Sequence, residues 1–264
     1  MSLSSESLIV KVRQLFDGVS LRENMVLHIE KGVFKDIEAG GANFEVEVDG
    51  LVVPGFIDLQ VNGGGGVLFN DAPSLKSLAQ IAYAHAKFGT TGMLPTIITD
   101  EASKMREAAN VVSQALKEKM PGVLGIHFEG PHISVEKKGA HSEVFIRRIS
   151  TEEWQIFTRK DIGKVVITLA PECVSTDDIK RLVDSGVIVS IGHTNASYEC
   201  VEEAIKAGAS GFTHIFNAMS PLRSREPGVT GAALLNDSTM CGVILDGHHV
   251  SIPTCKLALK AKPR

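Results

Sequence analysis

The spacing of apolar and polar residues changes near residue 54 and divides the chain into two parts. Before that point, short runs with alternating apolar residues are separated by turn residues, a pattern typical of β-strands. The runs expected to form strands are 8–12, 25–29, 33–37 and 44–48. We therefore predict a small antiparallel β module over residues 1–53, the N-terminal part of a β-sandwich.

After Val53-Pro54-Gly55, short apolar runs alternate with amphipathic stretches of helical period, which indicates a parallel sheet with crossover helices. The predicted strands are 55–61, 92–95, 123–129, 165–170, 187–191, 211–214 and 241–245. The predicted helix starts are Ser150-x-x-Glu153, Ser175-x-x-Asp178 and Ser197. Seven strands are one short of a (β/α)8 TIM-type barrel, and the stretch is shorter than the roughly 250 residues typical of that fold. We predict a barrel over 54–264 that is incomplete at the C-terminus, truncated before strand eight.

Composition and charge narrow the class of protein. A net charge of −4 offers no basic face for nucleic acid. No apolar run approaches membrane-spanning length, and the first residues lack a basic region followed by an apolar stretch, so we predict a cytoplasmic protein without membrane contact. The cysteines at 173, 200, 241 and 255 show no CxxC pair, and we expect reduced, mostly buried thiols.

Three residues with metal-binding side chains lie at equivalent predicted strand ends. His193 follows the strand 187–191, His214 ends the strand 211–214, and Glu129 ends the strand 123–129. Because the carboxyl ends of parallel strands meet at one face of a barrel, the three can converge on one ion. Two imidazoles and a carboxylate leave an open position for water, as in hydrolytic zinc sites, although iron or another divalent metal fits the same set.

His127 lies two residues before Glu129 and points to the same side of the strand. Ligation and a supporting or packing role are both compatible with that position.

Five segments in this order resemble the N-acetylglucosamine-6-phosphate deacetylases of the amidohydrolase superfamily. They are 55–63, 127–131, 192–196, 213–219 and 225–228. The resemblance implies a metal-dependent hydrolase that converts N-acetyl-D-glucosamine 6-phosphate to D-glucosamine 6-phosphate and acetate in amino-sugar catabolism, and that forms a homodimer. Many amidohydrolases carry a His-x-His pair on the first barrel strand, where this chain has Gln60 and Asn62. The resemblance therefore implies a single metal ion, zinc or iron, at Glu129, His193 and His214. Gln60 and Asn62 as polar residues that bind water fit the same facts.

The resemblance also assigns contacts to the sugar phosphate. Ala140 and His141 would contact the sugar, with His141 able to polarise the acetamide carbonyl. Asn217 and Ala218 would donate to the phosphate, and Arg225 would supply a bidentate cation.

Two further histidines, His249 and His132, lie near the predicted site, and only His249 is given a role by the resemblance. His249, the second histidine after Asp246-Gly247, is assigned to substrate binding by the resemblance. His132 stands where relatives often have an apolar aromatic residue, and its role is open.

Protonation of the departing amine requires an acid/base group near the metal, usually a carboxylate. In the family this group is an aspartate after barrel strand eight, which is expected beyond Arg264. Asp246 is the nearest strand-end carboxylate, but the residues after it match a substrate-binding loop. If the polypeptide ends at Arg264, we therefore predict metal binding at best and little or no turnover.

Two other functions are compatible with the residues. One is an amidohydrolase of cyclic amides, such as a dihydroorotase, although the His-x-His pair and carboxylated lysine usual there are not at the expected strand ends. The other is a sugar-phosphate-binding or regulatory pseudoenzyme, which absence of the acid/base residue would explain.

Overall fold

The computed structural model describes residues 7–41 and 43–262. Residue contacts divide the chain into two compact units, Met1–Phe56 and Ile57–Arg264. The first six residues, on which the expectation of no leader rests, lie outside the described ranges. Within those ranges, no helix combines the length and apolar composition needed to cross a membrane.

The first unit contains a four-stranded sheet in the order β3-β2-β1-β4. Its strands are β1 (Ser7–Phe16), β2 (Leu21–Glu30), β3 (Val33–Ala39) and β4 (Val46–Val52). The four strands match the sequence prediction, but a wholly antiparallel arrangement is wrong, because β4 pairs in parallel with β1. β3 occupies the edge of the sheet beside β2, so the free edge for β4 is the one beside β1. Val12, Leu15, Met25 and Leu27 form the core of this unit.

The second unit is built on a seven-stranded sheet in the order β13-β12-β11-β10-β9-β8-β5. Its strands are β5 (Phe56–Val61), β8 (Thr90–Ile98), β9 (Gly125–Glu129), β10 (Lys164–Leu169), β11 (Ile188–Ile191), β12 (Gly211–Phe212) and β13 (Met240–Cys241). Strands β8 to β13 pair in parallel. The predicted fold class, a parallel βα sheet of the TIM-barrel type with seven strands, is confirmed.

The last predicted strand, 241–245, is much shorter in the structure. β13 ends at Cys241, and the Asp246 carboxylate accepts hydrogen bonds from the backbone N–H groups of His248 and His249. Before this turn, only Gly242 continues the pairing among the described backbone groups of 242–245, because its N–H donates to Phe212 and its carbonyl accepts from Ile215.

Helices alternate with these strands, and the sheet is accompanied by a short hairpin, β6 (Gly63–Gly64) and β7 (Val67–Leu68). The helices are α1 (Leu75–Ala86), α2 (Ala102–Lys117), α3 (Thr151–Phe157), α4 (Thr176–Asp184), α5 (Tyr198–Lys206), α6 (Gly228–Leu235) and α7 (Ile252–Ala261). Ser150 and Glu153 form the predicted capping box of α3, and Ser197 caps α5. Ser175 caps α4, but the Asp178 carboxylate accepts from the Ser175 hydroxyl, so this cap is not a reciprocal box.

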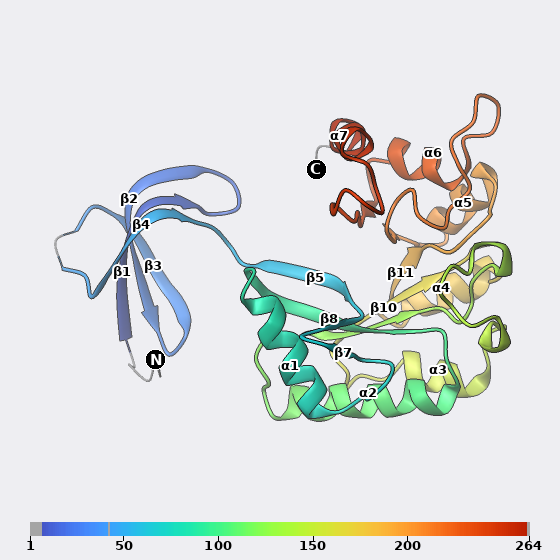
Figure 1. The fold of residues 1–264 in the computed structure, drawn as a ribbon, viewed down its shortest axis with the longest axis horizontal. Coiled ribbons are helices and arrows are strands. Elements are labelled where there is room, and N and C mark those ends of the chain that lie inside the picture. The colour runs from blue at the N-terminus through green and yellow to red at the C-terminus, as the bar shows by residue number, and fades with distance from the viewer. Residues whose placement is uncertain (1–6, 42, 263–264) are drawn as a thin grey trace. The chain divides into compact units, whose positions relative to one another are not determined.

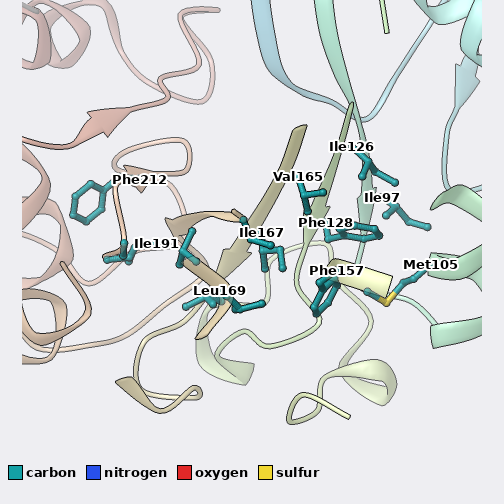
Figure 2. Close-up of a cluster of buried hydrophobic side chains, with 14 of the residues drawn as sticks. Ile97, Met105, Ile126, Phe128, Phe157, Val165, Ile167, Leu169, Ile191 and Phe212 are labelled. Atoms are coloured by element: carbon teal, nitrogen blue, oxygen red, sulfur yellow. The ribbon is translucent and has the colours of Figure 1, made fainter. Parts of the chain in front are cut away.

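Alternation along the strands separates an apolar face from a polar one. On β9, Ile126 and Phe128 are fully buried, and the Phe128 ring lies 5.1 Å from the ring of Phe157 on α3. In Figure 1, helices α1, α2 and α3 lie on one side of strands β5, β8 and β10, below them in the view. Figure 2 shows how the apolar row continues across the sheet through Val165, Ile167, Leu169, Ile191 and Phe212. The residues that alternate with these apolar ones along each strand, including His127 and Glu129 on β9, therefore face the opposite side of the sheet, where the candidate site lies.

All four cysteines are free thiols, as expected from their spacing. Only Cys255 is buried, so the expectation of mostly buried thiols is wrong for the other three, which are half-buried. Burial still raises the pKa of Cys173 to about 11. Such a thiol is protonated and unreactive near neutral pH.

Candidate active site

Glu129, His193 and His214 converge at the carboxyl ends of three strands. Glu129 is the last residue of β9, His193 follows β11 and His214 follows β12, and all three are buried. Glu129 Oε1 lies 3.2 Å from His193 Nε2 and 3.1 Å from His214 Nε2, and the two nitrogens are 2.9 Å apart. The three side chains thus point one atom each at a common centre.

The dimensions and the chemistry of this triangle fit a divalent metal ion. Ligands at about 2.0–2.1 Å from a tetrahedral ion are separated by about 3.3–3.4 Å, close to the observed spacings. Two imidazole nitrogens at 2.9 Å repel each other unless a proton or a cation lies between them. His193 Nδ1 lies 2.8 Å from the carbonyl of Lys137, to which it must donate, so Nε2 of the neutral ring offers a lone pair.

The backbone at both histidines adopts a conformation that L residues seldom use. His193 has φ of 48° and His214 has φ of 37°. Such left-handed conformations cost of order 1–3 kcal/mol and persist where the surroundings impose them. The two ligands are therefore held in position by the packing of the strand ends.

Glu129 is ionised in this arrangement. Burial raises the pKa of its carboxyl group, but the adjacent side chains of His193 and His214 outweigh burial and hold the pKa well below its usual range. Gln60 on β5 adds a further donor, because its Nε2 lies 2.7 Å from Glu129 Oε1. Gln60 therefore contacts the carboxylate of the metal-binding set.

His141 lies beside the triangle and is buried. Its ring centroid is 4.3 Å from that of His193. The backbone N–H of Thr99 donates to His141 Nδ1 at 3.3 Å, which leaves the proton of the neutral ring on Nε2. Burial and the neighbouring His193 lower the pKa of His141 to about 4. His141 is thus a neutral hydrogen-bond donor at neutral pH.

A long loop between β9 and α3 carries His141 and is fastened by Arg147. The loop contains two short 3-10 turns, Val135–Lys137 and Glu143–Phe145. The backbone N–H of Arg147 donates to the carbonyl of Pro131, and its guanidinium donates to the carbonyls of Phe145 and Asp100. The same guanidinium lies 2.8 Å from the fully buried carboxylate of Glu153.

His132 and His127 are buried but lie outside the triangle. His132 Nδ1 donates to the carbonyl of Arg147 at 2.8 Å, and its Nε2 has no hydrogen-bond partner among residues 7–41 and 43–262. His127 Nδ1 donates to the carbonyl of Leu59 at 2.7 Å. Burial lowers the pKa of both rings, so both are neutral near pH 7.

The remaining predicted residues lie in loops that follow the strands. Asn217 donates its backbone N–H to the carbonyl of His214, and the next residue, Ala218, has φ of 49°. Arg225 is exposed in the segment before α6. His249 is exposed and its Nδ1 lies 2.6 Å from Asp246 Oδ2. Ala140 is exposed next to His141.

Two contacts of the site were not foreseen from the sequence. Thr99 fixes the tautomer of His141, and Arg147 fastens the loop that carries it. Thr99 directly follows β8, but the strand predicted there, 92–95, ends four residues earlier, so the predicted strand end did not point to Thr99. Arg147 carries no signal either, since a charged loop residue usually faces solvent.

Comparisons with known proteins show the family of this chain. The amidohydrolase family model matches residues 51–263, and the chain belongs to that family. The N-acetylgalactosamine-6-phosphate deacetylase of Shewanella sp. (strain ANA-3) is 54% identical over 213 residues, which cover 81% of this chain and 54% of that protein. The N-acetylglucosamine-6-phosphate deacetylase of Haemophilus influenzae is 37% identical over 228 residues, covering 86% and 59%.

The same fold occurs in a crystal structure of N-acetylglucosamine-6-phosphate deacetylase from Pasteurella multocida. It superposes with a TM-score of 0.89 at 36% identity, covering 97% of this chain and 69% of that one. The resemblance predicted from the sequence motifs is thereby confirmed. The chain spans little more than half the length of the two curated relatives named above.

Proposed function

We propose that this protein is a metal-dependent deacetylase of N-acetylated hexosamine 6-phosphates in amino-sugar catabolism. The convergence of Glu129 Oε1 with the Nε2 atoms of His193 and His214 carries the proposal. A divalent ion, zinc or iron, would be held by these three residues and would supply the Lewis acidity that activates water for attack on an amide.

The protein's own residues would bind and polarise the substrate around this centre. Nε2–H of neutral His141 would donate to the acetamide oxygen as negative charge develops there. Gln60 would keep the carboxylate of Glu129 oriented by its 2.7 Å contact. Both effects depend on groups that are already in place before substrate binds.

The phosphate and the sugar would be held by loop residues. The Arg225 guanidinium is exposed and suits a phosphate because it can donate two parallel hydrogen bonds. Asn217 and Ala218 would add donors from the loop after β12, while Ala140 and His249 would contact the sugar. We also propose a cytoplasmic homodimer, with residues 1–53 as a β module and 54–264 as the catalytic barrel.

Two sugars that differ only at carbon 4 are candidate substrates. N-acetylglucosamine 6-phosphate is the substrate implied by the sequence motifs and by the names of several relatives. N-acetylgalactosamine 6-phosphate is favoured by the relative with 54% identity, which exceeds the 37% of the Haemophilus influenzae protein.

Binding and acetate release, measured with both sugars, test the function. The chain is loaded with Zn²⁺ or Fe²⁺, binding is followed by calorimetry, and acetate and free amine are quantified in parallel. We expect metal-dependent binding that E129Q abolishes, whereas H248N, at an exposed histidine with no assigned role, behaves as the unsubstituted chain. Binding of neither sugar would contradict the proposal.

The acetate assay also separates the remaining alternatives. Binding without acetate release would favour the pseudoenzyme, and the prediction of little or no turnover by residues 1–264 would hold. A larger kcat/KM for N-acetylgalactosamine 6-phosphate would assign the protein to that epimer.

A further inference from the structure

A chain of short hydrogen bonds crosses the inner face of the sheet next to the metal-binding set, and the proposed function does not use it. His127 Nε2 lies 2.7 Å from Thr168 Oγ1, which lies 2.6 Å from Thr213 Oγ1. Thr213 Oγ1 is in turn 2.7 Å from Ser190 Oγ. All four side chains are buried, so these groups depend on one another for hydrogen bonds.

One backbone carbonyl sets the direction of the whole chain of hydrogen bonds. The carbonyl of Leu59 can only accept, so His127 Nδ1 carries the proton of the neutral ring and Nε2 must accept from Thr168. With its proton committed to His127, Thr168 accepts from the hydroxyl of Thr213. Thr213 then accepts from Ser190, and each hydroxyl has a single defined orientation.

These four residues link the strands that carry the metal ligands. His127 precedes Glu129 by two residues on β9, and Thr168 on β10 is paired in register with Glu129. Thr213 directly precedes His214. Glu129 is therefore two residues from His127 and opposite Thr168 on the neighbouring strand, and His214 is next to Thr213.

The third ligand is tied to the chain by a close backbone approach. Gly192 directly precedes His193, and a Cβ added there would lie 2.8 Å from both Thr168 Cγ2 and Thr213 Cβ. Real Cβ atoms do not tolerate such distances, so the backbone before His193 packs on the two threonines only because residue 192 is glycine.

We propose that His127, Thr168, Thr213 and Ser190 form a relay that positions the three metal ligands, with Thr168 as its central positioning residue. The inference rests on the proposed metal-dependent function. Ligand geometry must hold to within a few tenths of an ångström for tight binding, and groups behind the ligands set that geometry. Loss of a relay hydroxyl should therefore weaken metal binding more than the accompanying loss of folding stability can account for.

The test compares variants of Thr168 with a matched threonine outside the relay. Thr168→Val keeps the shape and removes the hydroxyl, and Thr168→Ser restores the hydroxyl. Thr96 on β8 is equally buried, but its hydroxyl accepts from the N–H of Val61 and donates to the carbonyl of Leu94, so Thr96→Val is the control. Metal affinity of the whole chain is measured by Zn²⁺ competition and by the visible absorption of bound Co²⁺, and stability by thermal unfolding.

We expect Thr168→Val to weaken metal binding about 10-fold, the lower end of the range for groups bonded directly to metal ligands, because Thr168 acts on the ligands through neighbouring residues. The Co²⁺ spectrum should change as well. Thr168→Ser should return close to the affinity of the unsubstituted chain. Thr96→Val should lose stability while keeping that affinity. If Thr168→Val does not fold, Ser190→Ala, which removes only the last donor, should give a smaller weakening in the same direction.

Several outcomes would overturn the relay. Unchanged affinity in Thr168→Val and Ser190→Ala would do so while leaving the proposed function intact. Equal weakening by Thr96→Val would assign the effect to general loosening of the barrel. Failure of the unsubstituted chain to bind Zn²⁺ or Co²⁺ would remove the metal site, and the proposed function with it.

Discussion

At the scale of single residues, this site is defined by which nitrogen of each histidine carries a proton. His193 and His127 donate from Nδ1 to backbone carbonyls, whereas His141 accepts at Nδ1 from the N–H of Thr99. His193 therefore presents a lone pair at Nε2 and His141 presents a donor there. The same type of side chain thus offers a lone pair in one place and a hydrogen-bond donor in another.

Removal of the His141 donor should affect turnover and spare metal binding. Where acetate release is measured, we expect His141→Leu to lower its kcat about 10²- to 10³-fold, the usual cost of losing one donor to a developing oxyanion. His141→Gln keeps an N–H donor and should retain more activity than His141→Leu. Zn²⁺ affinity measured in parallel should match that of the unsubstituted chain in both variants, and a large loss of affinity would contradict the assigned role.

His132 should make stability depend on pH in the weakly acidic range. Burial lowers its pKa below the usual value, so the unfolded chain binds a proton at this ring at a higher pH than the folded chain does. Stability should therefore fall as the pH drops below about 6.5. In His132→Phe this contribution is absent, and the aromatic contact with Phe157 can be kept.

Thermal unfolding of both chains between pH 8 and pH 5 checks this prediction. The unfolding temperature of His132→Phe should rise relative to that of the unsubstituted chain as the pH falls. Parallel curves over the whole range would show that His132 does not contribute.

At the scale of elements, the loop between β9 and α3 depends on one ion pair with a buried partner. Glu153 is inaccessible to solvent and is balanced by Arg147, whose backbone and guanidinium also hold the two ends of the loop. The neighbouring residue on α3, Glu152, pairs with Arg106 on the surface. The two arginines therefore provide a natural comparison.

Arg147→Met should destabilise the protein by about 3–5 kcal/mol, because it leaves the buried carboxylate of Glu153 without a positively charged partner. Arg106→Met should cost less than about 1 kcal/mol, as is usual for exposed pairs. Urea unfolding gives both values. Hydrogen exchange over 131–147 should rise only in Arg147→Met, and similar costs for the two substitutions would argue against this account of the loop.

At the scale of the whole molecule, the two units have separate cores of very different size. The first is held by Val12, Leu15, Met25 and Leu27, while the second buries an extensive apolar layer between its sheet and helices (Figure 2). The small core leaves the first unit with little reserve of stability.

Leu27→Ala should therefore destabilise the first unit without changing the metal site. We expect a cost of about 2–5 kcal/mol, as for other buried leucines, which exposes residues 7–52 to proteolysis. Zn²⁺ affinity, carried by the second unit, should be unchanged. Weaker metal binding in Leu27→Ala would mean that the two units are energetically coupled.

Apart from the length of the last strand, the sequence by itself determined the main strands of both units, the parallel βα order and the convergence of Glu129, His193 and His214, because alternating apolar residues and strand ends are local features. It failed for the parallel pairing of β4 with β1, since the choice of a sheet edge depends on where the other strands already lie. Only the tertiary structure decided which ring nitrogen carries each proton, that Thr99 and Arg147 support His141, and that His127 is linked to Thr168 and Thr213. These properties depend on hydrogen bonds between residues tens of positions apart, and no local pattern in the chain encodes such pairings.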